Sequence, residues 1–302
     1  MAANKSQNKI QHWVPQCYLR YWCDTDIPEN YTPYVWLYSK DWSIQKPKAP
    51  ENIFAESELY TIDMPNGERD LSIEHKLSKL ETTYGQVVSK IVKNQSITPD
   101  EQADLCLFLS AMHERTPFQR DHWKKQWSGM YSNMNRMKKE IEEASPKRRA
   151  KMTSLGRLSH GPTLSMEDVR RRAEKPLQEM MVPRVSSRAS ILTRMNLSIL
   201  YSISKARFLT SDNPAVIFDP ESNKRHWMYE GGIQFETVEI TLPLTPKHTL
   251  LLTWKELPQY IEITRKKVEL LNQRNWAYAR NFVVGNSKID KPSWVPEQVD
   301  FD

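Results

Sequence analysis

Glycine is scarce in this sequence of 302 residues, where only 8 occur. Neither GxGxxG nor GxxxxGKS/T is present, so the Gly-rich loops that cradle nucleotide phosphates are excluded. A GxSxG nucleophile elbow is also absent, and no spacing of Ser, His and Asp singles out a catalytic triad. The common nucleotide-binding and serine-hydrolase signatures therefore do not apply to this chain.

Cysteine is rarer still, with Cys17, Cys23 and Cys106 as the only three. They are too few and too scattered for a disulfide framework or a closed zinc site. Cys17 and Cys23 lie among apolar residues and are expected to behave as small buried hydrophobes. The sequence also lacks a signal-peptide core and any run of 18 apolar residues. We therefore expect a cytoplasmic protein with reduced thiols and no membrane helix.

Positive charge is concentrated in one segment of the chain. The whole sequence has a net charge of +6, whereas the segment from Glu114 to Arg188 holds 18 Lys and Arg against 9 Asp and Glu. Such a basic sector is typical of a polyanion binder, and a solvated charged face is the alternative. The candidate nucleic-acid-binding residues are Lys147, Arg148, Arg149, Arg170, Arg171 and Arg172.

The hydrophobic pattern divides the chain into a helical centre and a β-rich C-terminal third. Residues 32–42 alternate aromatic and polar side chains and predict a strand, and residues 47–70 predict a loop. Apolar residues at helical spacing predict a helix over 72–94. Thr98 and Pro99 are typical of a helix start. The helix that follows is expected to extend through residues 104–127, with a disturbance at Pro117. Charged helices around a flexible connector are expected over 130–182, and a helix is expected to resume over 182–195.

After Asn196 the spacing of apolar residues changes from one typical of helices to one typical of strands. Strands are predicted within LSILYSIS, RFLTSDNPAVIFD, FETVEITLPLT and HTLLLTW, with Pro243 restricting one strand to a sheet edge or a bulge. A closing helix over 264–281 and a last strand at FVVGN follow. The expected fold is α+β, a single large domain over 1–302 with a helical central part, a β-rich C-terminal third and an N-terminal strand.

The opening stretch HWVPQCYLRYW sets polar residues among aromatic ones. Pro15 restricts Val14 to an extended conformation and so stiffens the backbone that carries His12 and Gln16. A structural histidine bonded within the fold is the alternative for His12. Glu74 and Glu81 are seven residues apart on one predicted helix, so both carboxylates project to one face. They could hold a divalent cation or act in acid–base chemistry, unless Glu74 belongs to an exposed helix flank.

Two further polar motifs lie next to apolar runs. In HERTP, Arg115 follows a packed helix, and a buried guanidinium needs a carboxylate or phosphate partner. HERTP lacks the second histidine of a zinc-protease HExxH motif. In TSDNP, Asp212 and Asn213 stand at a strand end, where side chains either bond their own turn or carry function.

These motifs resemble those of the DUF4238 family, in the same order and over nearly the whole chain. The similarity covers HWVPQCYLR, the stretch around Tyr60, IEHKLSKLE, HERTP, FLTSDNP, LPLTP and the pair Leu271-Asn272. The resemblance implies a domain of unknown function, found mostly in bacteria, and no reaction. Glutamine is common in the family at the position of His113, which argues against catalysis by this histidine. Residues 128–182 carry none of the family motifs and are interpreted as a variable basic helical insertion.

Stiff polar residues on separate elements suggest convergence in one pocket. The hypothesis places six residues there: His12, Gln16, Glu81, Arg115, Asp212 and Asn213. His12 would be the general acid or base, Arg115 would bind phosphate, and Glu81 and Asp212 would orient other groups or share a metal ion such as Mg²⁺ or Mn²⁺.

The function expected from this pocket and the basic sector is a nucleic-acid phosphodiesterase, with RNA ahead of DNA as substrate. A bacterial toxin or a phage-defence effector would be a setting for such an enzyme. A second hypothesis is a non-catalytic protein that binds nucleic acid or a protein partner and uses the same residues as a buried network. A third is a hydrolase or transferase acting on a phosphorylated small molecule.

Overall fold

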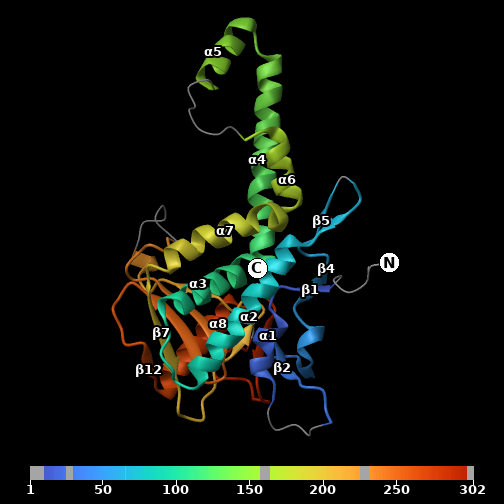
Figure 1. The fold of residues 1–302 in the computed structure, drawn as a ribbon. Helices are drawn as coiled ribbons and strands as arrows, with labels where there is room; N and C mark the ends of the chain where they lie inside the picture. The colour runs from blue at the N-terminus through green and yellow to red at the C-terminus, as the bar shows by residue number, and fades with distance from the viewer. Residues whose placement is uncertain (1–9, 25–29, 65, 157–163, 225–231, 298–302) are drawn as a thin grey trace.

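The computed structural model describes residues 10–24, 30–64, 66–156, 164–224 and 232–297 (Figure 1). Within them, helices occupy the centre of the chain, strands dominate the C-terminal third, and strand β1 (Ile10–His12) opens the fold. The predicted α+β class is therefore confirmed. The strands form two larger sheets and two pairs, and helices cover the five-stranded sheet.

The helices follow the apolar spacing of the sequence. Helix α2 (Ser72–Val92) buries one face that includes Leu77, Tyr84 and Val88. Helix α3 (Pro99–Glu114) begins with a capping box, in which the Thr98 and Glu101 side chains each accept the other's backbone N–H. Tyr84 and Phe108 stack with ring centroids 3.8 Å apart and join the two helices.

The helix expected to continue through Pro117 is in fact two helices. Helix α3 ends at Glu114, and the Thr116 side chain caps helix α4 (Pro117–Glu143) by accepting the N–H of Gln119. Proline at the first helical position starts a helix readily because its missing N–H would have no partner there. The disturbance predicted at Pro117 is therefore a complete break, and it leaves Arg115 at the end of α3.

The larger sheet has the order β12-β7-β11-β10-β9. Its pairs are antiparallel except for β12 with β7. The register of β10 against β11 shifts between Pro243 and Thr245, so Pro243 lies at a bulge of an internal strand and not at an edge. The strands are β7 (Asn196–Tyr201), β9 (Val216–Phe218), β10 (Glu239–Thr245), β11 (His248–Thr253) and β12 (Tyr260–Glu262).

The four-stranded sheet joins N-terminal strands to the last strand of the chain, whereas the two strand pairs lie within residues 10–70. The four-stranded sheet has the order β3-β2-β13-β8, and the two pairs are β1-β4 and β5-β6. Residues 47–70, expected to be loop, thus contain short strands. The bounds are β2 (Val35–Ser39), β3 (Gln45–Lys48), β4 (Ala55–Ser57), β5 (Ile62–Asp63), β6 (Arg69–Asp70), β8 (Thr210–Ser211) and β13 (Phe282–Gly285).

The remaining helices include one that completes a layer with α2 and α3. Helix α7 (Pro176–Leu192) packs along α3, which also contacts α2, so the three form a layer over the core (Figure 1). The remaining helical bounds are α1 (Gln16–Leu19), α5 (Pro146–Gly156), α6 (Met166–Glu174), α8 (Arg265–Tyr278), and the 3₁₀ turns Arg20–Trp22, Pro50–Asn52 and Ser222–Lys224.

A helical arm projects from the body of the protein. It consists of most of α4, with α6 packed against it and α5 at its tip (Figure 1). Helix α4 buries no residue completely, and Trp123, Trp127 and Tyr131 form its half-buried face. The charged helices predicted over 130–182 are therefore present, and part of the expected connector, residues 157–163, lies outside the described residues.

Candidate functional site

Four of the six predicted pocket residues line one cavity of about 360 Å³. It lies where β1 and α1 meet α2 and the end of α3, and we call it the His12 cavity. The predicted members present are His12, Gln16, Glu81 and Arg115. The complete lining is Ile10, Gln11, His12, Pro15, Gln16, Cys17, Arg20, Tyr60, Glu74, Leu77, Ser78, Glu81 and Arg115.

His12 is held at the end of β1 in a defined orientation. Its backbone pairs with Ala55 of β4, and its ring Nε2 lies 3.2 Å from the carbonyl oxygen of Glu51. A carbonyl accepts only, so Nε2 donates a proton and the neutral ring keeps its lone pair on Nδ1. Burial lowers the pKa of His12 below its usual value. The imidazole is therefore neutral at pH 7 and can accept a proton.

Arg115 lies almost completely buried at the wall of the His12 cavity, with 1% of its side chain exposed. Its Nη1 donates to Glu81 Oε1 at 3.0 Å, and Nη2 contacts the sulfur of Met112 at 3.8 Å. Its Nε, among the described residues, has no hydrogen-bond partner. A guanidinium has five N–H donors, so Glu81 leaves most of this donor capacity unused. The predicted carboxylate partner of Arg115 is thus Glu81.

Besides the hydroxyl of Ser78, two polar side chains at this cavity make no side-chain hydrogen bond or ion pair with another described residue. They are the half-buried Gln16, at the start of α1, and the exposed Arg20. Their donors are available to a ligand. Cys17 lies between them on the lining, but burial raises the pKa of its thiol to about 12. The thiol stays protonated at neutral pH and is a poor nucleophile.

Buried hydrogen bonds fix the frame of the cavity. Gln11, 3% exposed, donates to Glu74 Oε2 at 2.8 Å and accepts the backbone N–H of Tyr60. The Tyr60 hydroxyl lies 3.3 Å from the carbonyl oxygen of His12 and 3.5 Å from that of Arg115. Glu74 and Glu81 both line the cavity, as their spacing on α2 predicted.

The six residues predicted for the pocket do not include Gln11, Tyr60 and Arg20, which also line this cavity. A buried glutamine directly before His12 gave no separate signal. The position of Arg20 four residues after Gln16 could have been used, because this spacing places both on one face of a helix.

Asp212 and Asn213 belong to a different cavity, so the hypothesis of one pocket for all six residues does not hold. This second cavity is lined by Trp13, Glu56, Thr116, Pro117, Phe118, Arg120, Asp212, Asn213, Arg280 and Asn281. The Asp212 carboxylate accepts the backbone N–H groups of Arg280, Asn281 and Phe282 at 2.8, 2.8 and 3.1 Å. Burial raises the pKa of Asp212, while these three N–H bonds act in the opposite direction.

This geometry gives Asp212 a structural position at the turn before β13. The Asn213 amide likewise donates to the carbonyl of Tyr278 at 3.0 Å. Trp13, the residue after His12, lines this second cavity, and its indole N–H donates to the Asp212 carbonyl oxygen at 3.2 Å. Neither Asp212 nor Asn213 lines the His12 cavity.

His113 and Glu114 form a buried cluster with α7 on the other side of α3. Glu114 is 1% exposed and accepts from Arg188 Nε at 2.9 Å and from Arg184 Nε at 3.4 Å. Burial, with smaller contributions from Arg188 and Arg184, lowers the pKa of His113 to about 3. His113 is therefore neutral in the fold and does not line the His12 cavity.

We expect His113 to make stability fall as the pH is lowered from 6.5 towards 3. The unfolded chain binds a proton near pH 6.5, whereas the folded protein does not, so acid favours unfolding by up to about 1.4 kcal/mol per pH unit. Urea unfolding of the wild type and of His113→Gln at several pH values from 7 to 4.5 tests this. The variant should show a shallower dependence, and parallel curves would contradict the assignment.

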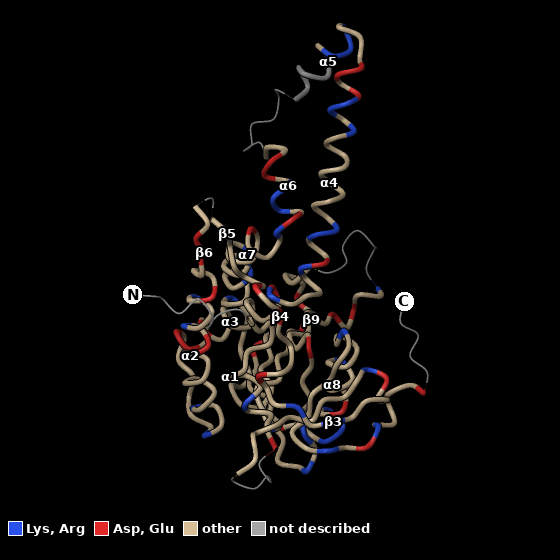
Figure 2. The backbone as a smooth tube through the Cα atoms, turned by 90° about the vertical axis from the view of Figure 1, so that its right-hand side faces the viewer, with Lys and Arg blue, Asp and Glu red and all other residues tan. Residues whose placement is uncertain are grey.

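The candidate nucleic-acid-binding residues all lie on the helical arm (Figure 2). Arg170 pairs with Glu167 and Glu174, and Arg171 pairs with Asp168 and Glu179. Arg172 stands over the Trp127 ring at 4.9 Å. The arginines of α6 are therefore largely engaged within the arm.

The basic side chains at the tip of the arm have fewer acidic partners than those of α6. Arg149 donates to the carbonyl oxygens of Ile141 and Glu142 at the end of α4. Lys147 and Arg148 are exposed and form no ion pair with the other described residues. Helix α5 carries no acidic residue. Any electrostatic attraction of a polyanion to the tip of the arm thus comes from α5.

Two features of the described residues bear on the expected metal ion and membrane helix. No group of three or more His, Cys, Asp or Glu side chains among them is arranged to hold a metal ion. In the His12 cavity each carboxylate already has a partner, Gln11 for Glu74 and Arg115 for Glu81. Of the helices in the described ranges, none is both long and apolar enough to cross a membrane.

The fold and the His12 cavity define an α+β protein with a small polar site that contains one neutral histidine and two arginines. The chain belongs to the family described as protein of unknown function (DUF4238), whose model matches residues 10–289. The resemblance seen in the sequence motifs is thus confirmed. No curated protein and no solved structure is significantly similar to the chain.

Proposed function

We propose that this protein cleaves phosphodiester bonds in RNA and that the His12 cavity is its active site. The observation that carries the proposal is that one cavity contains both the neutral, oriented imidazole of His12 and the buried guanidinium of Arg115. A base that can accept a proton and a cation that can balance an anion are the two groups that phosphoryl transfer to an internal nucleophile requires.

Each group has a definite role in this reaction. Nδ1 of His12 takes the proton of a ribose 2′-hydroxyl, whose oxygen then attacks the adjacent phosphorus. The bond from phosphorus to the 5′-oxygen breaks, the leaving oxygen takes a proton from solvent, and a 2′,3′-cyclic phosphate forms. Arg115 and Arg20 balance the negative charge on the phosphoryl oxygens, and the Gln16 amide donates a hydrogen bond to one of them.

The choice of RNA follows from the groups present in the cavity. A single histidine base can activate a hydroxyl that is already held beside the phosphorus, as the ribose 2′-hydroxyl is. DNA lacks this hydroxyl and would need a separately activated water, for which a metal ion is the usual source. In the His12 cavity, the carboxylates of Glu74 and Glu81 already accept hydrogen bonds from Gln11 and Arg115, and this favours the route through the 2′-hydroxyl.

Incubation of the purified protein with RNA, single-stranded DNA and duplex DNA tests the proposal, with Mg²⁺, Mn²⁺ or EDTA in parallel. We expect RNA cleavage in EDTA with cyclic phosphate ends, and His12→Ala should lower the rate by about 100-fold or more while RNA binding persists. His75→Ala is the matched control, because His75 is an exposed histidine on α2 outside the cavity. Equal rates in wild type and His12→Ala would refute the assignment.

A phosphorylated small molecule is the second candidate substrate. The observations that favour it are the cavity volume of about 360 Å³ and the pairing of Arg170 and Arg171 within the arm. Such a volume fits one small ligand. Release of phosphate from nucleoside monophosphates, lost in His12→Ala and unaffected by Lys147→Gln with Arg148→Gln, would favour this substrate over RNA.

A further inference from the structure

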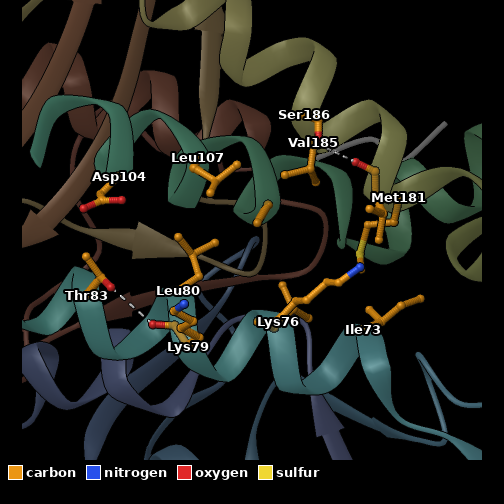
Figure 3. Close-up of a pocket in the computed structure, with 13 residues that line it drawn as sticks. Ile73, Lys76, Lys79, Leu80, Thr83, Asp104, Leu107, Met181, Val185 and Ser186 are labelled. Atoms are coloured by element: carbon orange, nitrogen blue, oxygen red, sulfur yellow. Dashed lines mark hydrogen bonds between the residues drawn. The ribbon is translucent and has the colours of Figure 1, made fainter. Parts of the chain in front are cut away.

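A second cavity of about 360 Å³ lies between helices α2, α3 and α7, and we call it the α2–α7 groove (Figure 3). Its apolar side chains come from all three helices, and Figure 3 shows them facing one another across the opening. Those that define its walls are Ile73, Leu77, Leu80, Leu107, Met181 and Val185.

The groove arises from the way the three helices pack. Helices α2 and α7 each lie against α3, so α3 closes one side of the space between α2 and α7. Its floor is the small apolar cluster that contains Leu77, Ala111 and Met181, while Val182 and Val185 are only partly buried. An opening of this size lined by apolar side chains is in the range of small-molecule sites.

The charges along the groove are asymmetric. Figure 3 shows the Lys76 side chain extending toward Met181 at one end, whereas Asp104 and Thr83 lie at the other end. Lys79 also lines the groove, and both lysines are exposed on α2. Neither lysine forms an ion pair or a side-chain hydrogen bond with another described residue. An anionic group is therefore attracted to the Lys76 end and repelled from the Asp104 end.

We propose that the α2–α7 groove binds a small amphipathic carboxylate, with its apolar chain between α2 and α7 and its carboxylate at Lys76, while Lys79, one turn further along α2, adds positive charge (Figure 3). The groove follows α2 from Ile73 to Thr83, about 15 Å at 1.5 Å per residue, which suits an extended aliphatic chain. Burial of that chain supplies the attraction, at about 25 cal/mol per Å² of apolar surface removed from water. The lysines select the charge and direction of the ligand.

This site is distinct from the proposed RNA site, although the two are neighbours. Leu77 lines both cavities from α2, and Ala111 and Arg115 stand one turn apart on α3 with one residue in each lining. Lys76 and Lys79 do not line the His12 cavity. Substitutions of these lysines can therefore test the groove without removing any residue assigned to RNA cleavage.

Isothermal titration calorimetry with dodecanoate, dodecylammonium and dodecanol, each below its micelle concentration, tests the proposal. We expect dodecanoate to bind with one-to-one stoichiometry and at least tenfold more tightly than dodecylammonium. Lys76→Gln combined with Lys79→Gln should weaken dodecanoate binding at least tenfold. Lys93→Gln is the matched control, since Lys93 is an exposed lysine just after α2 and outside the groove, and it should have no effect.

A second variant tests the position of the ligand. Ser186 is an exposed residue at the groove, so Ser186→Trp places a large ring over the opening and should abolish binding, with the unfolding temperature measured to verify folding. If that variant does not fold, the lysine variants, which lie at exposed positions, still test whether the groove binds the carboxylate. Absence of dodecanoate binding, tighter binding of dodecylammonium, or unchanged binding in the double lysine variant would overturn the proposal.

Discussion

Glu114→Ala should destabilise the protein by about 3–5 kcal/mol, the usual cost of removing one partner of a buried charge pair. The substitution removes a carboxylate that is 1% exposed and accepts from both Arg184 and Arg188. Arg188, 13% exposed, would be left with a positive charge and no carboxylate beside it. Arg184 would keep its stacking over the Trp123 ring at 3.8 Å.

The reason for this large effect is that Glu114 joins two helices. It stands at the end of α3, whereas both arginines come from α7, so the cluster fixes the place where α7 packs. Urea unfolding followed by tryptophan fluorescence gives the change in free energy. Glu140→Ala is the control, because Glu140 is exposed and pairs weakly with Arg136 at 3.9 Å, and it should change stability by less than about 0.5 kcal/mol.

The loss of stability in Glu114→Gln should lie between the losses in Glu114→Ala and Glu140→Ala. The amide keeps the shape of the side chain and one acceptor oxygen but loses the charge that the two arginines face. A loss below about 1 kcal/mol for Glu114→Ala would contradict the assignment, since it is less than the penalty for one unsatisfied buried charge.

Asp212→Ala should lower stability by about 3 kcal/mol or more. Three backbone N–H groups at Arg280, Asn281 and Phe282 would lose their acceptor, at about 1–3 kcal/mol for each donor that stays buried without a partner. These N–H groups lead into β13, the strand that pairs with both β2 and β8. The four-stranded sheet would therefore lose the anchor at one end of an internal strand.

Asn213→Ala is the matched neighbour, because it loses a single hydrogen bond to the carbonyl of Tyr278 and should cost about 1 kcal/mol. The two variants also separate a structural from a catalytic role. If Asp212 were catalytic, Asp212→Ala would fold with nearly wild-type stability and lose RNA cleavage. That pattern would contradict the position assigned to Asp212 here.

Local patterns determined the helices of the central part. The apolar spacing of α2 predicted which face is buried, and the Thr98-Pro99-Asp100-Glu101 sequence predicted the start of α3 through groups that lie within one turn. The same locality applies to Arg170, whose partners Glu167 and Glu174 lie three and four positions away. That spacing could have predicted that α6 neutralises much of its own charge.

Contacts between distant segments decided the site. Arg115 meets Glu81 across 34 positions of sequence, and Gln11 meets Glu74 across 63, so no local rule predicts either pair. The sequence by itself selected His12, Gln16, Glu81 and Arg115 because each is a polar residue in an apolar setting, and packing then brought these four to one cavity. Asp212 had the same local signal, but tertiary folding placed the turn before β13 around its carboxylate. A buried polar residue must find a partner, and only the tertiary structure decides whether that partner is the protein's own backbone or is left for a ligand.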